Sequence, residues 1–341
     1  MTDTMLIYKI ILCVIVFAVS LGAAAYMTWG ERKLAAWLQD RVGPNRAGPL
    51  GLLQPIADGI KMIFKEEMIP THSNRWLFIL GPSFFMLCAC MTGVVIPWGA
   101  GWQVGDVTYP MQVTDINIGL LYLLSVVSIG VYGVMIGGWA SNNKFALLGA
   151  LRASSQMISY ELAMGVSAIT IVLLSGSLSL NDIVNGQQDV WNIFYQPVAF
   201  LIFFICALAE LNRAPFDLPE CESELVGGYH TEYSSMKLGL YLFSEYTSMF
   251  VSSAIMSILF FGGYNFPGMS HFSGNTLAIL GIAAFAIKIF IFIFVIMWIR
   301  WTIPRFRFDQ LMHLGWKSLL PLSLINLLIT GIVIAYQNGW F

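Results

Sequence analysis

Eight long hydrophobic segments constrain what this chain can fold into. Each approaches the length of about 20 apolar residues that a helix needs to cross the hydrocarbon core of a bilayer. The alternating pattern of barrel strands is absent, and only 11% of the 341 residues are charged. We therefore predict an all-α integral membrane protein, a single membrane domain over 1–341 with eight transmembrane helices. The predicted spans are approximately 5–29, 76–98, 116–138, 155–175, 190–211, 238–262, 276–299 and 318–336.

The distribution of Lys and Arg predicts how the chain crosses the membrane. Fifteen of the 17 basic residues fall in four loops, which are 30–75, 139–154, 212–237 and 300–317. Because basic residues concentrate on the cytoplasmic side, we predict that these loops are cytoplasmic. Both termini then lie on the opposite side, which is the periplasm in a bacterium. The apolar run from Met5 to Trp29 is too long for a signal peptide, so it is predicted to remain as the first span.

The first cytoplasmic loop contains the pattern of a short amphipathic helix between Leu52 and Phe64. Apolar residues recur there at helical spacing, while Asp58, Lys61 and Lys65 fall on another face. Such a helix is long enough to lie along the membrane interface and too short to span it. It either anchors the loop to the surface or roofs an opening between lipid and the protein interior. The second interpretation is favoured by the neighbouring charges, which are Glu31, Arg32, Lys33, Arg41 and Arg46.

Ionisable residues inside the spans point to function, because charge in hydrocarbon is costly. Glu161, Glu210 and Glu245 are each predicted to lie on the order of 10 Å below the cytoplasmic surface, and Lys288 lies deeper. Three carboxylates in one layer above a lysine predict a buried proton path. The alternative is one or two static ion pairs that hold helices together. Tyr160 and Tyr246 flank two of the glutamates and are predicted to be their hydroxyl partners.

The third cytoplasmic loop is unusually acidic. Pro215 and Pro219 exclude a continuous helix through 210–219. Large apolar residues alternate with the acids, which indicates a packed segment rather than a solvated acidic loop. The acids of the loop are Asp217, Glu220, Glu222, Glu224 and Glu232.

The sequence offers no pattern for a bound cofactor. The five cysteines form no CxxC pair, and we interpret them as buried inert thiols rather than metal or iron–sulfur ligands. The glycines of GAGWQVG at 99–105 have the wrong spacing for a dinucleotide site, and no strand precedes them. A net charge of −2 gives no reason to expect a nucleic-acid partner. We therefore predict that the chain by itself binds no metal, flavin, iron–sulfur cluster or NADH.

Several long motifs resemble one family, the H subunits of the proton-translocating NADH-quinone oxidoreductase, or respiratory complex I, whose mitochondrial counterpart is subunit 1. The resemblance covers essentially the whole chain. The motifs are ERK at 31–33, RVGPNRAGPLGLLQPIADGIK at 41–61, QMISYE at 156–161, ELNRAPFDLPECESELVGGYHTEYS at 210–234, SEYT at 244–247 and PRFRFDQLMHLGWK at 304–317.

The resemblance implies a membrane subunit of an enzyme, without a complete active site of its own. It implies that the chain forms the entrance and lining of the quinone tunnel, docks the hydrophilic arm and couples quinone reduction to proton translocation. The implied tunnel residues are Glu31, Arg32, Arg41, Arg46, Asp58 and Arg300. The implied proton path comprises Glu161, Glu210, Asp217, Glu220, Glu222, Glu224, Glu232 and Glu245. The implied docking surface includes Arg305, Arg307 and Asp309.

The resemblance also implies partners and a location. Quinone is the expected substrate, and the terminal iron–sulfur cluster belongs to a neighbour. The expected partners are quinone-site hydrophilic subunits, small membrane subunits, antiporter-like subunits and membrane lipid. The expected location is the inner membrane of a bacterium or mitochondrion. Two alternatives stay open, a membrane subunit of an energy-converting hydrogenase and a stand-alone secondary transporter; no internal repeat favours the transporter.

Overall fold

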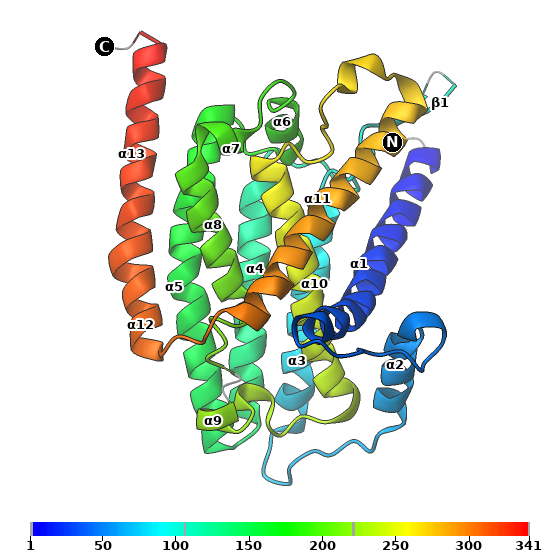
Figure 1. Cartoon of the computed structure of the whole chain (residues 1–341), viewed down its shortest axis with the longest axis vertical. Coiled ribbons are helices and arrows are strands. Elements are labelled where there is room, and N and C mark those ends of the chain that lie inside the picture. The colour runs from blue at the N-terminus through cyan, green and yellow to red at the C-terminus, as the bar shows by residue number, and fades with distance from the viewer. Residues whose placement is uncertain (1–2, 106, 220–221, 340–341) are drawn as a thin grey trace.

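The computed structural model describes residues 3–105, 107–219 and 222–339 as a bundle of helices (Figure 1). Seven helical segments within these residues are long and apolar enough to cross a membrane. The last of them, Phe308–Gln337, is continuous through α12 (Phe308–His313), a π-helical turn (Leu314–Leu319) and α13 (Leu320–Gln337). The other six are α1 (Asp3–Leu38), α3 (Arg75–Met91, with the turn Thr92–Val95), α4 (Gly119–Ala140), α5 (Lys144–Ser175), α10 (Ser235–Phe260) and α11 (Gly274–Thr302). The helical membrane architecture is confirmed.

The fifth of the eight predicted spans, 190–211, is divided in two. A short helix α7 (Asn192–Tyr195) ends before Gln196, and α8 (Pro197–Glu210) then begins at a proline, which is favourable in the first helical turn. With 14 residues, α8 is about 21 Å long, less than the ~30 Å hydrocarbon core. The count of eight crossings therefore stays a prediction.

Several helices continue beyond the predicted hydrophobic segments, so parts of the predicted cytoplasmic loops are helical. Helix α5 begins at Lys144, so the predicted loop 139–154 is mostly helix. The Asn143 side chain accepts a hydrogen bond from the N–H of Phe145 and caps this helix. Helix α1 likewise continues to Leu38, inside the predicted loop 30–75. Hydropathy marks the lipid-facing length of a helix, whereas caps and packing decide where it ends.

Short elements fill the connections. The predicted amphipathic helix is present as α2 (Gln54–Phe64), preceded by a 3₁₀ turn at Pro49–Gly51. Between α3 and α4 lies a hairpin that the sequence analysis did not predict, formed by β1 (Trp102–Val104) and β2 (Val107–Tyr109) in antiparallel register, with Trp102 opposite Tyr109. The remaining short elements are α6 (Leu180–Asn185), α9 (Glu222–Leu225) and the 3₁₀ turns Gly228–His230 and Met269–His271.

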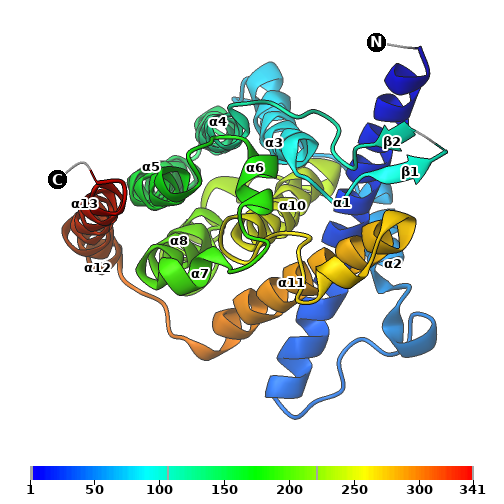
Figure 2. The ribbon, with the colours of Figure 1, turned by 90° about the horizontal axis from the view of Figure 1, so that it is seen from above.

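Two helices run obliquely across the bundle. Seen from above, α4, α5, α8 and α10 are close to end-on, whereas α1 and α11 are strongly tilted (Figure 2). Helix α1 begins and α13 ends at the same end of the bundle, and α2 and α9 lie at the other end (Figure 1). The loops predicted to be cytoplasmic therefore gather at one end.

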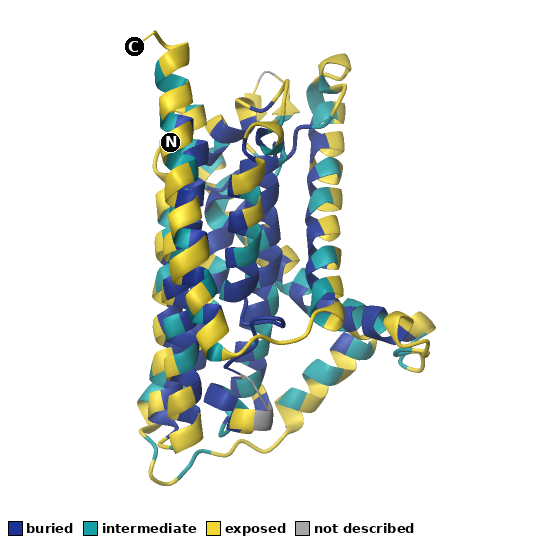
Figure 3. Ribbon diagram, turned by 60° about the vertical axis from the view of Figure 1, so that its left-hand side comes forward, coloured by how far each residue is buried: buried dark blue, intermediate teal, exposed yellow. Residues whose placement is uncertain are grey.

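The interior is packed around α10, while α13 exposes much of its surface (Figure 3). Glycines allow close approach of α3 and α4: a Cβ added at Gly81 would lie 2.9 Å from the Cα of Gly137. The hydroxyl of Tyr241 occupies this contact and donates to the carbonyl of Gly133 at 3.1 Å. This packing fixes α10 against α3 and α4 and so positions the polar residues on its next turns.

Candidate functional site

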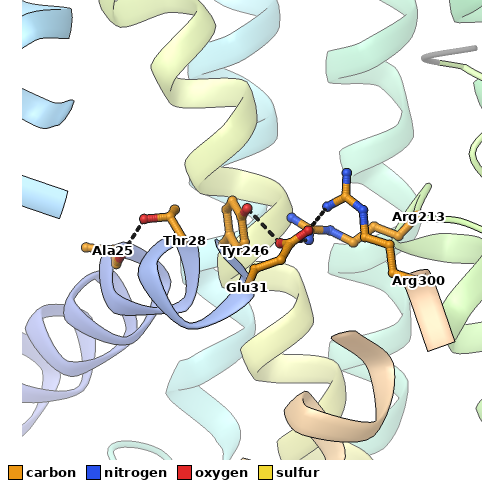
Figure 4. Close-up of polar contacts among 6 residues, drawn as sticks. All are labelled: Ala25, Thr28, Glu31, Arg213, Tyr246 and Arg300. Atoms are coloured by element: carbon orange, nitrogen blue, oxygen red, sulfur yellow. Dashed lines mark hydrogen bonds and ion pairs between the residues drawn. The ribbon is translucent and has the colours of Figure 1, made fainter. Parts of the chain in front are cut away.

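A buried charge cluster joins α1, α10, α11 and the segment after α8. Glu31 on α1 accepts from Arg213 at 2.6 Å, from the Tyr246 hydroxyl at 2.8 Å and from Arg300 (Figure 4). The side chains of Glu31 and Arg213 are only 6% and 4% exposed. The guanidinium of Arg213 also lies 4.1 Å from the centroid of the Tyr246 ring. Because buried charges are tolerated only when paired and hydrogen-bonded, each member of the cluster depends on the others.

Arg213 remains charged in this cluster. Burial alone would lower the pKa of Arg213, but its interactions with Glu31, then Tyr246 and then Glu245 raise the pKa above its usual range. Glu31, on α1, belongs to the buried charge cluster, whereas Glu245, on α10, lines a separate cavity inside the bundle. Arg213 is therefore electrostatically coupled to acids on two sides.

A cavity of about 470 Å³ borders this cluster. It lies between the end of α1, the loop that follows α1, and the end of α11. Polar and charged side chains line much of it, which suits a ligand with polar groups. The sequence-predicted tunnel residues Glu31, Arg32, Arg41 and Arg300 line this cavity. Arg46 is exposed and is not among the lining residues.

A second cavity of about 120 Å³ lies beneath α2. Its walls come from α1, α2 and α10, and its lining is mostly apolar, with Met62, Leu242 and Phe243 among the residues. Asp58 on α2 accepts from Arg32 on α1 at 2.7 Å, which ties the amphipathic helix to the first span. Three residues, Thr28, Arg32 and Tyr246, line both this cavity and the larger one. The two cavities are therefore adjacent.

Two acids line a narrow cavity inside the bundle. Glu210 at the end of α8 and Glu245 on α10 both border a space of about 50 Å³, which has room for more than one water molecule. The buried hydroxyl of Tyr229 donates to Glu245 at 2.8 Å. Glu161 on α5 accepts from the hydroxyl of Ser128 on α4 and does not line this cavity.

The acids of the third cytoplasmic loop bind different neighbours. Buried Asp217 pairs with Arg305 at 2.9 Å, and exposed Glu224 pairs with Arg152 on α5 at 2.5 Å. Glu232 accepts from the amide of Asn143 at 2.6 Å. Glu220 and the side chain of Glu222 lie outside the described residues. The loop is held to α5 and to the 300–317 segment rather than solvated, as its apolar residues predict.

The predicted docking residues form the start of α12 and the extended segment before it. Arg305 reaches back to Asp217, and the N–H of Phe306 donates to the carbonyl of Pro215 at 3.2 Å. Arg307 is the N-cap of α12, and Asp309 lies in its first turn, where an acid is favourable. The 300–317 segment is thus fastened to the acidic loop.

Lys288 does not join the acids. Its ammonium donates to the carbonyls of Phe261, Gly263 and Asn265 at 2.7, 2.8 and 2.5 Å. These carbonyls follow the C-terminal end of α10, where a cation is favourable. The contacts favour a structural role, and a role for Lys288 in a proton path stays a prediction.

The predicted tyrosine partners were wrong, and one central residue was missed. Tyr246 donates to Glu31 rather than to Glu245, and Tyr160 donates to the carbonyl of Leu311 at 2.9 Å. Adjacent residues of a helix point about 100° apart, so a tyrosine next to a glutamate cannot share its direction. Sequence reasoning counted Arg213 only as a basic loop residue. Its isolation among acids was the signal that could have identified it.

Comparison with known proteins identifies the family. A family model described as NADH dehydrogenase matches residues 10–331. The chain is 62% identical over 329 residues to an H subunit of NADH-quinone oxidoreductase from Cytophaga hutchinsonii, a match that covers 96% of each chain. The chain belongs to the H-subunit family of NADH-quinone oxidoreductases.

Other members of this family are similar along nearly their whole length. The H subunit of Flavobacterium johnsoniae is 59% identical over 339 residues, covering 98% of this chain and 97% of the relative. An H subunit of Geobacter sulfurreducens is 50% identical over 322 residues, covering 94% and 95%. The chain is therefore a multi-pass subunit of an NADH-quinone oxidoreductase in the inner membrane. This relationship, and not the hydrogenase or transporter alternative, accounts for these matches.

Proposed function

We propose that this chain forms the entrance and part of the lining of the quinone tunnel and couples quinone reduction to proton translocation. The observation that carries the proposal is the pair of adjacent cavities on α1. The mostly apolar cavity beneath the amphipathic helix α2 shares Thr28, Arg32 and Tyr246 with the charged cavity beside Glu31. An apolar tail suits the first, and the oxygens of a quinone ring suit the donors of the second.

Arg213 is the proposed link between the tunnel and the proton path. It binds Glu31 at the charged cavity, and the charge of Glu245 acts on it from the acid cavity. A change of charge in the tunnel would shift the Arg213–Glu31 pair and hence the field at Glu245. The proposed proton path uses Glu210 and Glu245 with Glu161, and the loop acids Asp217, Glu220, Glu222, Glu224 and Glu232.

The proposal includes substrate, partners and orientation. Quinone is the substrate, and the chain itself would hold no flavin, iron–sulfur cluster or metal. Within the described residues, no group of three or more His, Cys, Asp or Glu could hold a metal ion. The end with α2 and α9 faces the cytoplasm, where Arg305, Arg307 and Asp309 would meet the hydrophilic arm. Small membrane and antiporter-like subunits would flank the bundle, and both termini would face the periplasm.

The proposed tunnel is tested by placing a larger side chain where the two cavities adjoin. Thr28 lines both, so Thr28→Phe should lower kcat/KM for a short-chain quinone at least about tenfold. The control is Thr276→Phe, an exposed threonine at the opposite end of α11. NADH oxidation with ferricyanide needs only the hydrophilic arm, so its retention on washed membranes reports that this arm remains attached. The same kcat/KM for the quinone in Thr28→Phe and Thr276→Phe would contradict the tunnel assignment.

The proton path is tested at the acid cavity. Glu210→Gln and Glu245→Gln keep the side-chain size and remove the charge, so each should impair quinone reductase activity and proton pumping in membrane vesicles. Glu66→Gln changes an exposed carboxylate of the first cytoplasmic loop and should leave both unchanged. Normal activity together with normal pumping in both cavity variants would overturn the proposed proton path.

A further inference from the structure

A third cavity, of about 700 Å³, lies between α1 and α11. Its lining is almost wholly apolar, and among the described lining residues there is no carboxylate. An aromatic cluster forms part of its wall: Trp98 stacks on Phe250 at 5.8 Å between ring centroids and meets Phe285 at 5.7 Å. This groove is separate from the charged cavity, because Glu31 and Arg213 do not line it.

The groove is long. Its lining on α1 extends from Val19 to Trp37, about 27 Å at 1.5 Å per residue, and on α11 from Ile282 to Met297, about 22 Å. One leaflet of the hydrocarbon core is ~15 Å deep, half of the bilayer core. Figure 2 shows that α1 and α11 are both tilted. The groove between them is therefore long enough for a fatty acyl chain that follows this tilt.

One end of the groove is built differently. Lys33 is half-buried there among the lining residues, together with Trp29 and Trp37. The indole N–H of Trp29 donates to the carbonyl of Leu50 at 3.2 Å, which fastens the first cytoplasmic loop beside this end. Tryptophans of membrane proteins concentrate at the level of lipid headgroups. This end of the groove is therefore at the membrane interface.

Lys33 lacks the ion pair that three nearby arginines have. Arg32 pairs with Asp58, and Arg213 and Arg300 pair with Glu31. Lys33 has no ion pair with any of the residues that the structure describes. A half-buried lysine at headgroup level, beside a groove of acyl-chain length, matches an anionic phosphate with an acyl chain attached.

We propose that this groove binds an anionic phospholipid, with the phosphate at Lys33 and one acyl chain between α1 and α11. An acyl chain gains little by leaving the bilayer for an equally apolar groove. Selectivity must therefore come from the headgroup charge, which is attracted to a basic residue at the surface. The lipid proposal does not depend on the proposed quinone tunnel. Lys33 and Glu31 point in directions about 200° apart around α1, so the groove and the charged cavity lie on different faces of this helix.

The test uses the assembled complex in vesicles with a photoactivatable phosphatidylglycerol, labelled on its acyl chain, against phosphatidylcholine with the same label. We expect peptides of α1 and α11 to be labelled about fivefold more by the anionic lipid. Lys33→Gln should abolish this preference, and Lys33→Arg should keep it. Ala286→Phe, which fills the groove from α11, should reduce labelling by both lipids.

Two matched variants serve as controls. Lys65→Gln removes an exposed lysine, and Ala283→Phe adds the same bulk on α11 outside the groove; neither should change the labelling. The proposal would be overturned if both lipids labelled the protein equally and Lys33→Gln did not change the labelling. That result would indicate an ordinary lipid-exposed face. Competition by excess quinone would overturn it by assigning the groove to a quinone tail. Absence of labelling in the assembled complex would overturn it by assigning the groove to a partner protein.

Discussion

The coupling between Glu31 and Arg213 should be large because the pair is buried. Their contact is 2.6 Å long, and the side chains are 6% and 4% exposed. Removing one partner of a buried ion pair costs about 3–5 kcal/mol, since the other charge stays buried without compensation. Arg32 and Asp58 give a matched comparison, with a contact of 2.7 Å but exposures of 51% and 19%. An exposed pair contributes roughly 0–1 kcal/mol.

The measurement is a double-mutant cycle on purified complexes, using kcat/KM for a short-chain quinone. We expect Glu31→Gln and Arg213→Gln each to lower this ratio strongly, and the double variant to recover part of the loss because two neutral amides can hydrogen-bond. A coupling of about 2 kcal/mol makes the double variant roughly 30-fold more active than the product of the single effects. The cycle with Arg32→Gln and Asp58→Asn should give less than about fivefold.

Additive effects would refute this reasoning. If the effect of the double variant equals the sum of the Glu31 and Arg213 single effects to within about 0.5 kcal/mol, the two residues act independently. If both cycles give the same coupling, distance rather than burial decides its size. Ferricyanide reduction must stay normal in every variant, so that loss of the hydrophilic arm is not read as loss of the pair.

Three further predictions concern packing, pH and docking. Gly137→Ala places a Cβ inside the contact distance of the Tyr241 hydroxyl and should lower the thermal midpoint of the protein by overpacking worth about 1–3 kcal/mol, whereas Gly165→Ala, with no atom within 4 Å, should not. Burial raises the pKa of Tyr233 to about 12, so stability should fall as pH rises from about 10 towards 12, and Tyr233→Phe should reduce that slope in thermal melts. Arg305→Gln removes the guanidinium beside a buried aspartate of the acidic loop and should reduce the fraction of hydrophilic arm retained on native gels, whereas Lys65→Gln should not.

The helical membrane class, most of the long spans, the amphipathic helix and the family could all be predicted from the sequence. Hydrophobic length, the periodicity over 52–64 and long continuous motifs are local properties of the chain, so no tertiary information is needed to detect them. The prolines of the acidic loop likewise interrupt a helix wherever the loop lies. The division of 190–211 at Pro197 could have been noticed, because a proline inside a predicted span often begins a new helix.

The partners of the charged residues were decided only by the tertiary structure. Glu31 and Arg213 are 182 positions apart in the chain, and Glu31 and Arg300 are 269 apart. The crossing of α1 and α11 brings Glu31 and Arg300 together, and the packing of α11 beside another face of α1 places Lys33 at the apolar groove. Sequence shows which residues are costly to bury, because that cost belongs to the side chain alone. Which opposite charge offsets the cost depends on how the helices cross, which is set by packing between segments distant in sequence.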